Sequence, residues 1–371
     1  MNSQRRALLS WLAGAAIIAI VLYHLVHSAQ WRNFDWGRLA FLLTHVKIRI
    51  LALAFVVTCT SYLVRAYRWQ FFVDPIKRCS LRVLFAGQVL GFTSIYLVGR
   101  AGEIVRPGYI AKKERIPFMS QLAVLVLERV YDSFALVALL ALALYVEPVH
   151  STSGRSIGLV QKAHAAAFAI LIICGAMAMF LVAFRVYSEV VLRYISRILN
   201  FTPRIFRTHL MNFLVSFSSG LDVIQNPWDF AASLGMTAVL WVMNVSVFWL
   251  TLLSLGGHLA NLSWWAAGLL NFFAALGLVV QLPGVGGGFQ VAVLLALENL
   301  FHVSPESAAG AAILAYLTIM VPCLLLGLGF AAHEGLTFSK LKVIAEVDQE
   351  AAANLPQPHS LPQSPSSEIS A

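Results

Sequence analysis

Charged side chains gather in one short stretch of a chain that is otherwise strongly apolar. Between Gly99 and Asp132 the sequence reads GRAGEIVRPGYIAKKERIPFMSQLAVLVLERVYD. One set of charges lies near its start and a second near its end: Arg100, Glu103, Arg106, Glu128, Arg129 and Asp132. The second set falls inside residues 118–146, an apolar run of membrane-spanning length. Ionisable groups inside such a run are costly to bury and are usually functional.

The spacing within each set predicts that its members share a helix face. Arg100, Glu103 and Arg106 follow one another at intervals of three, which would make one charged stripe on a helix. Glu128 and Asp132 are four residues apart. If these carboxylates are buried they need cationic partners, and Arg100 or Arg106 are the natural ones. A purely structural ion-pair network and an anion-binding site both fit this pattern.

A further pair of arginines closes an apolar run. Arg65 and Arg68 stand beside Trp69. One interpretation is anchoring at a membrane surface, where basic and aromatic residues gather. The other is a clamp for phosphate, because a guanidinium can donate two parallel hydrogen bonds to phosphate oxygens.

A glycine-rich loop interrupts the second half of the chain. It comprises Pro283, Gly284, Gly286, Gly287 and Gly288, and Gln290 follows it. Proline and four glycines this close together cannot continue a helix. The loop is either a simple helix breaker or a nest of backbone N–H groups that binds an anion. It is no nucleotide-binding loop of the Walker type, because no Lys-Ser/Thr pair follows.

The composition is that of an integral membrane protein. Of 371 residues, 59% are hydrophobic and 12% charged, and the mean hydropathy is +0.78. A soluble domain carries about 25% charged residues. The net charge of +9 comes from basic segments between apolar runs, as expected for cytoplasmic loops rather than for nucleic-acid binding. Isolated cysteines and scattered histidines predict neither a metal nor another cofactor.

We expect an all-α, polytopic transmembrane helix bundle in the inner (plasma) membrane, with both termini in the cytoplasm. The basic segments lie on that side under the positive-inside rule. A basic amphipathic helix is expected over residues 185–207, on the cytoplasmic leaflet. Residues 1–340 would form one transmembrane domain, and residues 341–371, rich in Pro, Ser and Gln, a disordered cytoplasmic tail. The expected spans are 7–26, 48–64, 118–146, 163–184, 230–255 and 308–332.

Two further apolar segments are expected to enter the membrane and return. Residues 83–98 are short for a crossing and lie between two basic loops, so non-helical, re-entrant backbone would resolve their topology. Residues 264–300, broken by the glycine loop, would form a second hairpin that opens to the other side. Paired interrupted segments indicate an inverted repeat with a binding site near the midplane. The charged stretch and the glycine loop would then meet at one cavity.

Several runs resemble a known family of membrane proteins. RAYRWQFF, GQVLGF, GRAGEIVRP, LERVYD and LPGVGGGFQVAVLL are similar to the membrane region of lysylphosphatidylglycerol synthases, which also occurs alone as flippase-like proteins. The resemblance covers residues 7–332 and implies translocation of lipid between leaflets. The positions that match are Gly99, Arg100, Gly102, Glu103, Arg106, Glu128, Arg129, Asp132, Pro283, Gly284 and Gly288.

The chain also departs from that family. Members often have a glutamate shortly after the glycine loop, where this chain has Gln290. Nothing in the chain resembles the soluble aminoacyl-transferring domain of the synthases. We therefore do not expect this chain to make an aminoacyl lipid by itself.

The leading hypothesis is a translocator of a phospholipid or a lipid-linked anionic headgroup, without nucleotide hydrolysis. Arginines would bind the phosphate, and carboxylates would neutralise them when the site is empty. One alternative is a membrane-embedded lipid-headgroup transferase with Glu128 or Asp132 as general base. Another is an accessory subunit of an envelope lipid or glycolipid pathway. The expected partners are membrane lipids and no nucleic acid, with a homo-oligomer or an envelope-pathway enzyme left open.

Overall fold

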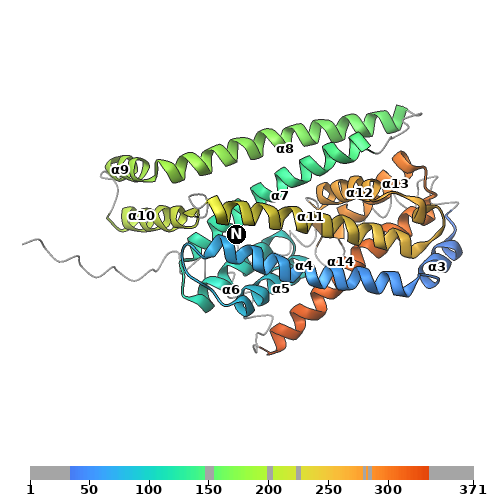
Figure 1. Ribbon diagram of the computed structural model, residues 1–371, viewed down its shortest axis with the longest axis horizontal. Coiled ribbons are helices and arrows are strands. Elements are labelled where there is room, and N and C mark those ends of the chain that lie inside the picture. The colour runs from blue at the N-terminus through green and yellow to red at the C-terminus, as the bar shows by residue number, and fades with distance from the viewer. Residues whose placement is uncertain are drawn as a thin grey trace, which may run out of the picture.

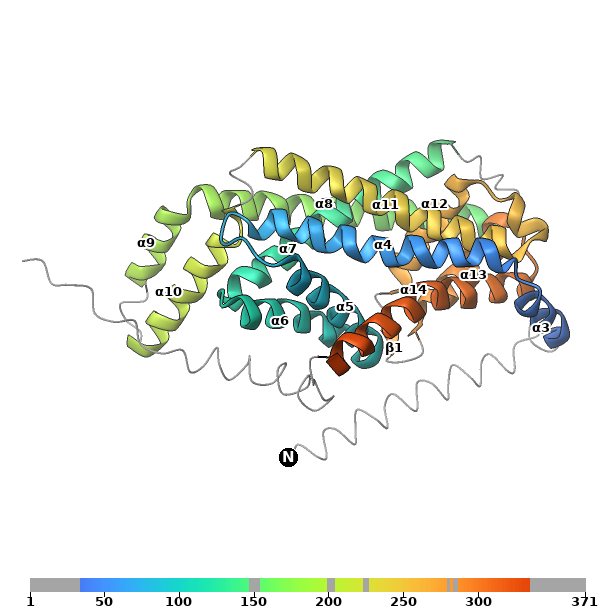
Figure 2. The ribbon, with the colours of Figure 1, turned by 60° about the horizontal axis from the view of Figure 1, so that its bottom comes forward.

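The computed structural model describes residues 34–146, 154–198, 204–222, 227–278, 281–282 and 286–333, and these are almost entirely helical. The long helices run along the long axis of the molecule (Figures 1 and 2). The expected first span, residues 7–26, and the expected tail, residues 341–371, lie outside the described residues. The all-α helix bundle predicted from the sequence is confirmed.

The first half contains two long helices with a helical hairpin between them. After α3 (Trp36–Thr44) the chain forms the long α4 and then turns into the hairpin, which a 3₁₀ helix interrupts; the long α7 completes this half. The bounds are α4 (Ile48–Val73), α5 (Leu81–Val98), η1 (Arg100–Ile104), α6 (Val105–Glu114) and α7 (Phe118–Val146).

The second half repeats this order of elements after a connecting segment. That segment is α8 (Gly154–Val186), α9 (Ser188–Ile198) and α10 (Arg204–Ser219). Then come the long α11, a hairpin with a short two-stranded turn, and the long α14. The bounds are α11 (Pro227–Leu255), η4 (Gly257–Asn261), α12 (Trp264–Gly277), β1 (Gln281–Leu282), β2 (Gly286–Gly287), α13 (Gly288–Phe301) and α14 (Pro305–His333).

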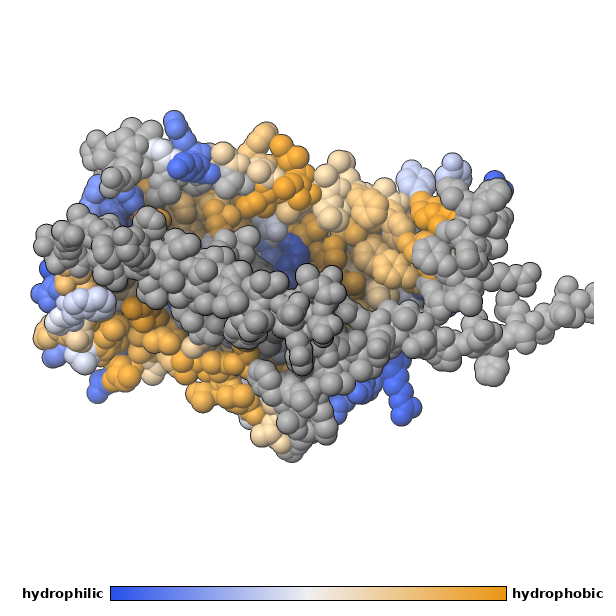
Figure 3. Space-filling view, turned by 180° about the vertical axis from the view of Figure 1, so that it is seen from behind, coloured by the Kyte–Doolittle hydropathy of each residue, from blue (hydrophilic) through white to orange (hydrophobic). Residues whose placement is uncertain are grey.

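Helix length and composition match a membrane. Within the described residues, α4, α11, most of α14 and residues 168–186 of α8 are long and apolar enough to span a bilayer. Helix α7 is as long as α11, at 29 residues, but it carries the charges at positions 128, 129 and 132. In the view of Figure 3, hydrophobic residues dominate the coloured surface between the two ends of the long axis, and most of the hydrophilic residues gather toward those ends. The protein is therefore a multi-pass membrane protein.

Close backbone contacts show that α5 and α6 form an antiparallel pair. Position 87 faces Ile110, position 91 faces Arg106, and Gly102 faces Ser94. The non-helical backbone expected over residues 83–98 is wrong, because this segment is helical to Val98. The chain turns only at Gly99, whose φ of +83° suits glycine. The second hairpin turns through β1 and β2, where Gln281 pairs with Gly287.

Two other expectations need correction. Arg100, Glu103 and Arg106 do not lie on one helix, because the chain passes from the 3₁₀ helix η1 into α6 between Glu103 and Arg106. Arg106 is buried while Glu103 is partly exposed. The basic helix expected over residues 185–207 is also not one helix, because α9 ends at Ile198 and α10 begins at Arg204.

The two halves pack reciprocally. Helices α4 and α11 lie against each other over much of their length. Helix α5 of the first hairpin packs on α14, and helix α12 of the second hairpin packs on α7. The hairpins lie toward opposite ends of the long axis (Figure 2). An inverted repeat would produce this arrangement; the repeat and its re-entrant insertion stay predictions.

Cysteine labelling tests the predicted sidedness. The loop after α4 meets the end of α6, where the Lys77 ammonium donates to the Glu114 carbonyl at 2.6 Å. Asn261 lies in η4, just after the end of α11. That end of α11 contacts the start of α4, because Lys47 N donates a hydrogen bond to Ser254 O. Helix α4, about 39 Å long at 1.5 Å per residue, separates the two regions.

On intact cells, a membrane-impermeant maleimide should label Asn261→Cys but neither Arg78→Cys nor Lys112→Cys, and permeabilisation should expose both. The native Cys79 should add little background. Its burial raises the pKa of the thiol to about 11, so little reactive thiolate exists near pH 7. Labelling of position 78 or 112 from outside would contradict the predicted topology.

Each hairpin has a glycine where a side chain would collide with backbone. A Cβ at Gly102 would lie 2.4 Å from the Ser94 carbonyl carbon, and one at Gly277 would lie 2.3 Å from the Gly288 oxygen. We expect Gly102→Ala and Gly277→Ala each to lower the free energy of unfolding by about 1–3 kcal/mol. Gly235→Ala in α11 is the control, because no atom lies within 4 Å of its Cβ position. Thermal unfolding followed by tryptophan fluorescence would measure this, and wild-type melting of both hairpin variants would refute the close packing.

Candidate functional site

A buried carboxylate shared by two arginines forms the centre of the charged cluster. Glu128 of α7 is 1% exposed and accepts hydrogen bonds from Arg68 of α4 on Oε1 and from Arg106 of α6 on Oε2, with a longer one from Arg106 Nη1 to Oε1 at 3.4 Å. Arg68 is fully buried and also donates to Asp132 Oδ1 at 2.8 Å and to Thr237 Oγ1 at 3.0 Å. Side chains from α4, α6, α7 and α11 are thereby joined in one network.

Neutral groups complete the surroundings of Arg106. Its Nη1 donates to Gln88 Oε1 at 2.8 Å, and its guanidinium carbon lies 4.1 Å from the centre of the Trp69 ring. Trp69 in turn donates from Nε1 to Gln121 Oε1 at 3.0 Å. Such cation–π and hydrogen-bond contacts offset part of the cost of burying the arginine. Arg106 is therefore fixed in position from three sides.

A looser layer of charges lies around this centre. Arg129 is within 3.8 Å of Glu103 and within 3.9 Å of Asp132, and its side chain is 41% exposed. At these distances Arg129 forms ion pairs with Glu103 and Asp132 but no close hydrogen bonds to them. We infer that Arg129 is held less tightly than Arg68 and Arg106.

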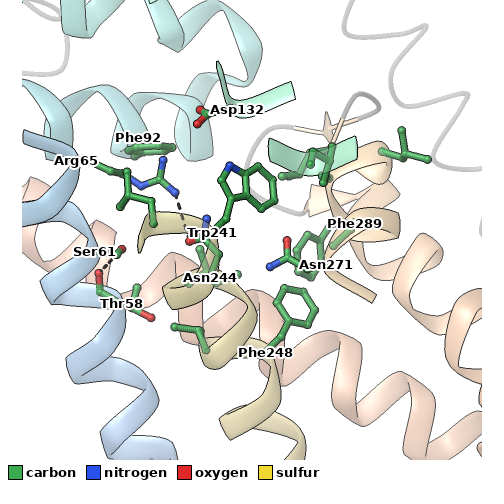
Figure 4. Close-up of a pocket in the computed structure, with 18 of the residues that line it drawn as sticks. Thr58, Ser61, Arg65, Phe92, Asp132, Trp241, Asn244, Phe248, Asn271 and Phe289 are labelled. Atoms are coloured by element: carbon green, nitrogen blue, oxygen red, sulfur yellow. Dashed lines mark hydrogen bonds between the residues drawn. The ribbon is translucent and has the colours of Figure 1, made fainter. Parts of the chain in front are cut away.

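The outer charges form one wall of a cavity of about 420 Å³. Arg65, Arg129 and Asp132 line it on the side of α4 and α7. Helices α11, α12 and α13 supply the facing wall, which includes Asn244 and Asn271 (Figure 4). The volume falls within the range of about 300–1,000 Å³ that small-ligand pockets occupy.

Arg65 is the one arginine of this cluster without a carboxylate partner in the described part of the chain. Its Nη2 donates to Asn244 Oδ1 at 3.3 Å, and its guanidinium carbon lies 5.3 Å from the centre of the Phe92 ring. Among the described residues of the cluster, four guanidinium groups face three carboxylates. These described groups therefore carry one excess positive charge at the cavity wall.

The structure brings most of the sequence-predicted residues together. Arg65, Arg68, Glu103, Arg106, Glu128, Arg129 and Asp132 all belong to the cluster. Glu128 has Arg106 as one partner, as expected, and Arg68 as the other. Pro283 and Gly284 lie outside the described residues, as does the side chain of Arg100.

The glycine loop has its described ends beside the cavity. Leu278, just after α12, and Phe289, in the first turn of α13, both line it. Gly286 and Gly287 form β2, Gly288 begins α13, and Gln290 follows Phe289 in that helix. Binding of an anion by the backbone of the loop stays a prediction.

Sequence reasoning missed several neutral polar residues. Gln88 and Thr237 hold the buried arginines, and Asn244 and Asn271 line the cavity. Each is a polar residue within a mostly apolar helix. Such a group is costly in a membrane unless it is hydrogen-bonded or faces a polar cavity, and that signal could have identified all four.

The arrangement favours binding over acid–base chemistry. Both carboxylates that could act as bases, Glu128 and Asp132, accept hydrogen bonds from arginine. In the described residues no group of three or more His, Cys, Asp and Glu side chains is placed to hold a metal ion. An anion at the cavity wall would satisfy the excess positive charge.

Glu128→Gln should lower the free energy of unfolding by about 3–5 kcal/mol, because two buried guanidinium groups lose their shared counter-charge. Glu189→Gln, on the exposed surface of α9, is the control and should change it by less than about 0.5 kcal/mol.

A double-mutant cycle separates the pair from other effects. Arg106→Gln with Glu128→Gln should cost clearly less than the sum of the single changes, because the paired charges vanish together. Additive melting temperatures would mean that the contact between Arg106 and Glu128 does not stabilise the fold.

Comparison with known proteins identifies the family of the chain. Searches of curated proteins and of solved structures gave no match. One family model, that of the lysylphosphatidylglycerol synthase TM region, matches residues 11–327, which include the whole charged cluster and both hairpins. The chain therefore belongs to the family of the lysylphosphatidylglycerol synthase transmembrane region.

Proposed function

We propose that this protein translocates a phospholipid or a lipid-linked anionic headgroup between the leaflets of the membrane, through the cavity beside the charged cluster. The observation that carries the proposal is Arg65. It faces the cavity from a membrane-spanning helix and has no carboxylate within 4.0 Å among the described residues. A phosphate is the counter-charge that this guanidinium lacks.

The magnitudes favour an anion. A charged residue at the centre of a membrane helix costs about 2.5–3.5 kcal/mol on insertion scales. A phosphate about 4 Å from a guanidinium gains about 4 kcal/mol at an effective dielectric constant near 20. One singly charged phosphodiester would supply the counter-charge that Arg65 lacks, and its attraction is at least as large as that cost.

The surrounding architecture suits a lipid. The cavity lies between the two hairpins, and its lining is mostly apolar apart from the charged and amide groups. A headgroup can occupy the polar wall while the acyl chains remain in the bilayer. Hairpins that enter from opposite ends are the arrangement in which transporters expose a fixed site alternately to each side.

The transferase alternative has less support. A general base needs a carboxylate available to the substrate proton. Glu128 is 1% exposed and bonded to two arginines, and Asp132 accepts from Arg68. Proton abstraction by either would first require those ion pairs to open.

Transport in proteoliposomes tests the proposal. The leaflet exchange of fluorescently labelled phosphatidylglycerol is followed by dithionite quenching, with and without a pH gradient. Arg65→Gln should slow the exchange at least about ten-fold, which corresponds to about 1.4 kcal/mol. Arg65→Lys should retain part of the rate, because it keeps the charge but not the planar donors.

Arg193→Gln is the matched control, since Arg193 is an exposed arginine of α9 outside the cavity. It removes the same charge and should leave the rate unchanged. Exchange at the wild-type rate in Arg65→Gln, or none in the wild type under either condition, would count against the proposed function.

A further inference from the structure

The cavity offers neutral hydrogen-bonding groups beyond the charged wall. Asn271 of α12 is 8% exposed and makes no hydrogen bond within the described part of the chain. In Figure 4 its amide points toward Asn244 and Trp241 across the cavity. A buried amide costs free energy unless a partner satisfies it, so this side chain indicates a polar ligand.

Two neighbours supply further neutral donors. Asn244 uses its oxygen to accept from Arg65, which leaves its Nδ2 hydrogens directed elsewhere. The indole Nε1 of Trp241 has no hydrogen-bond acceptor among the described residues, and its ring stands beside Arg65 and Asn244 in Figure 4. Asn271, Asn244 and Trp241 thus provide donors and an acceptor without charge, together with an aromatic face.

The same cavity is unsuited to a cationic headgroup. Asp132 is the only described carboxylate in its lining, and it already accepts from Arg68 at 2.8 Å and pairs with Arg129. An ammonium group would enter beside Arg65 and Arg129 with no available counter-charge. Like charges at this range in a low-dielectric site repel strongly.

We propose that the headgroup bound here is a phosphodiester that carries a neutral, hydroxyl-rich group, a polyol or sugar, in place of an aminoacyl or amine group. The phosphate contacts Arg65, and the hydroxyls are bound by Asn271, Asn244 and Trp241. This inference rests on the proposed function and names its substrate class. It disfavours an aminoacyl lipid as the substrate, because a site for the cationic headgroup of such a lipid needs available carboxylates.

The expected selectivity follows from hydrogen-bond strength. A neutral hydrogen bond changes an affinity by about two- to twelve-fold. Two or three bonds near the middle of that range should therefore favour the polyol lipid by about ten-fold or more over a lipid of equal charge that lacks them.

Three phospholipids with the same acyl chains separate the contributions. Phosphatidylinositol has the phosphodiester and a polyol, phosphatidylmethanol the same charge without hydroxyls, and phosphatidylethanolamine the phosphodiester with an ammonium. Each is titrated onto the purified full chain in detergent, and Kd is measured by native mass spectrometry. We expect phosphatidylinositol to bind at least about ten-fold more tightly than either of the others.

Variants of Asn271 sharpen the test. Asn271→Leu should remove most of the preference for phosphatidylinositol and change the Kd of phosphatidylmethanol by less than about two-fold. Asn271→Asp keeps the shape and adds a carboxylate, so it should tighten phosphatidylethanolamine and weaken phosphatidylinositol. Asn299→Leu is the control, because Asn299 bonds to the Leu295 carbonyl and does not line the cavity.

The outcomes are distinguishable. This inference would be overturned by equal Kd values for phosphatidylinositol and phosphatidylmethanol, or by tightest binding of phosphatidylethanolamine. The proposed function would stand in that case if the binding of anionic lipid still depended on Arg65. Anionic-lipid binding that is absent, or that Arg65→Gln does not weaken, would overturn both.

Discussion

The sharing of Glu128 between Arg68 and Arg106 is the interaction on which the rest of the site depends. Three charges are removed from solvent at one point, and each would be prohibitive there alone. Their burial is tolerable only if α4, α6 and α7 hold them in direct contact, so the ion pairs constrain how these helices pack. Helix α6 returns from the hairpin turn at Gly99, and the contact from Arg106 to Glu128 attaches that hairpin to the long helices.

This centre also explains why positive charge is left over at the cavity. Both oxygens of Glu128 are engaged by arginines, and Asp132 is shared between Arg68 and Arg129. Nothing remains among the described carboxylates for Arg65, one helical turn before Arg68 on α4. The rigid network therefore serves the cavity by saturating the carboxylates, and it presents a single guanidinium with defined geometry. A ligand that supplies the missing charge finds donors that need little reorganisation, which is the condition for selective binding.

Features that depend on the local sequence could be predicted. Features that depend on how each helix is rotated against its neighbours could not. The bounds expected for the span 118–146 agree with α7, because an apolar run between polar turns determines both ends. The membership of the charged cluster was also accessible from single residues in apolar surroundings. The partner of Glu128 was not, because Arg68 lies 60 residues away and its direction depends on how α4 and α7 pack. The same holds for Asn271, whose position on the cavity side of α12 follows from the contacts of that helix with α7 and α11. Residues 83–98 were predicted to be re-entrant and non-helical because they are short for a crossing and lie between two basic loops. Their glycines are compatible with a helix because they allow it to pack closely against α6.

The two hairpins are attached to the bundle by different kinds of contact, and this difference bears on translocation. The α5–α6 hairpin is held by buried ion pairs, which lose several kcal/mol when one partner moves away. At the cavity, the α12–α13 hairpin packs through Phe289, whose ring lies 5.8 Å from Phe248 and 5.5 Å from Tyr316 between ring centres. Aromatic contacts of this kind contribute about 0.5–1.5 kcal/mol beyond their buried area. Under the proposed function, a displacement of α12 and α13 would change access to the cavity and leave the ion pairs of Glu128 with Arg68 and Arg106 intact. Asn271 would move with that hairpin while Arg65 stayed fixed on α4, so a headgroup bound to both would couple its own passage to the movement.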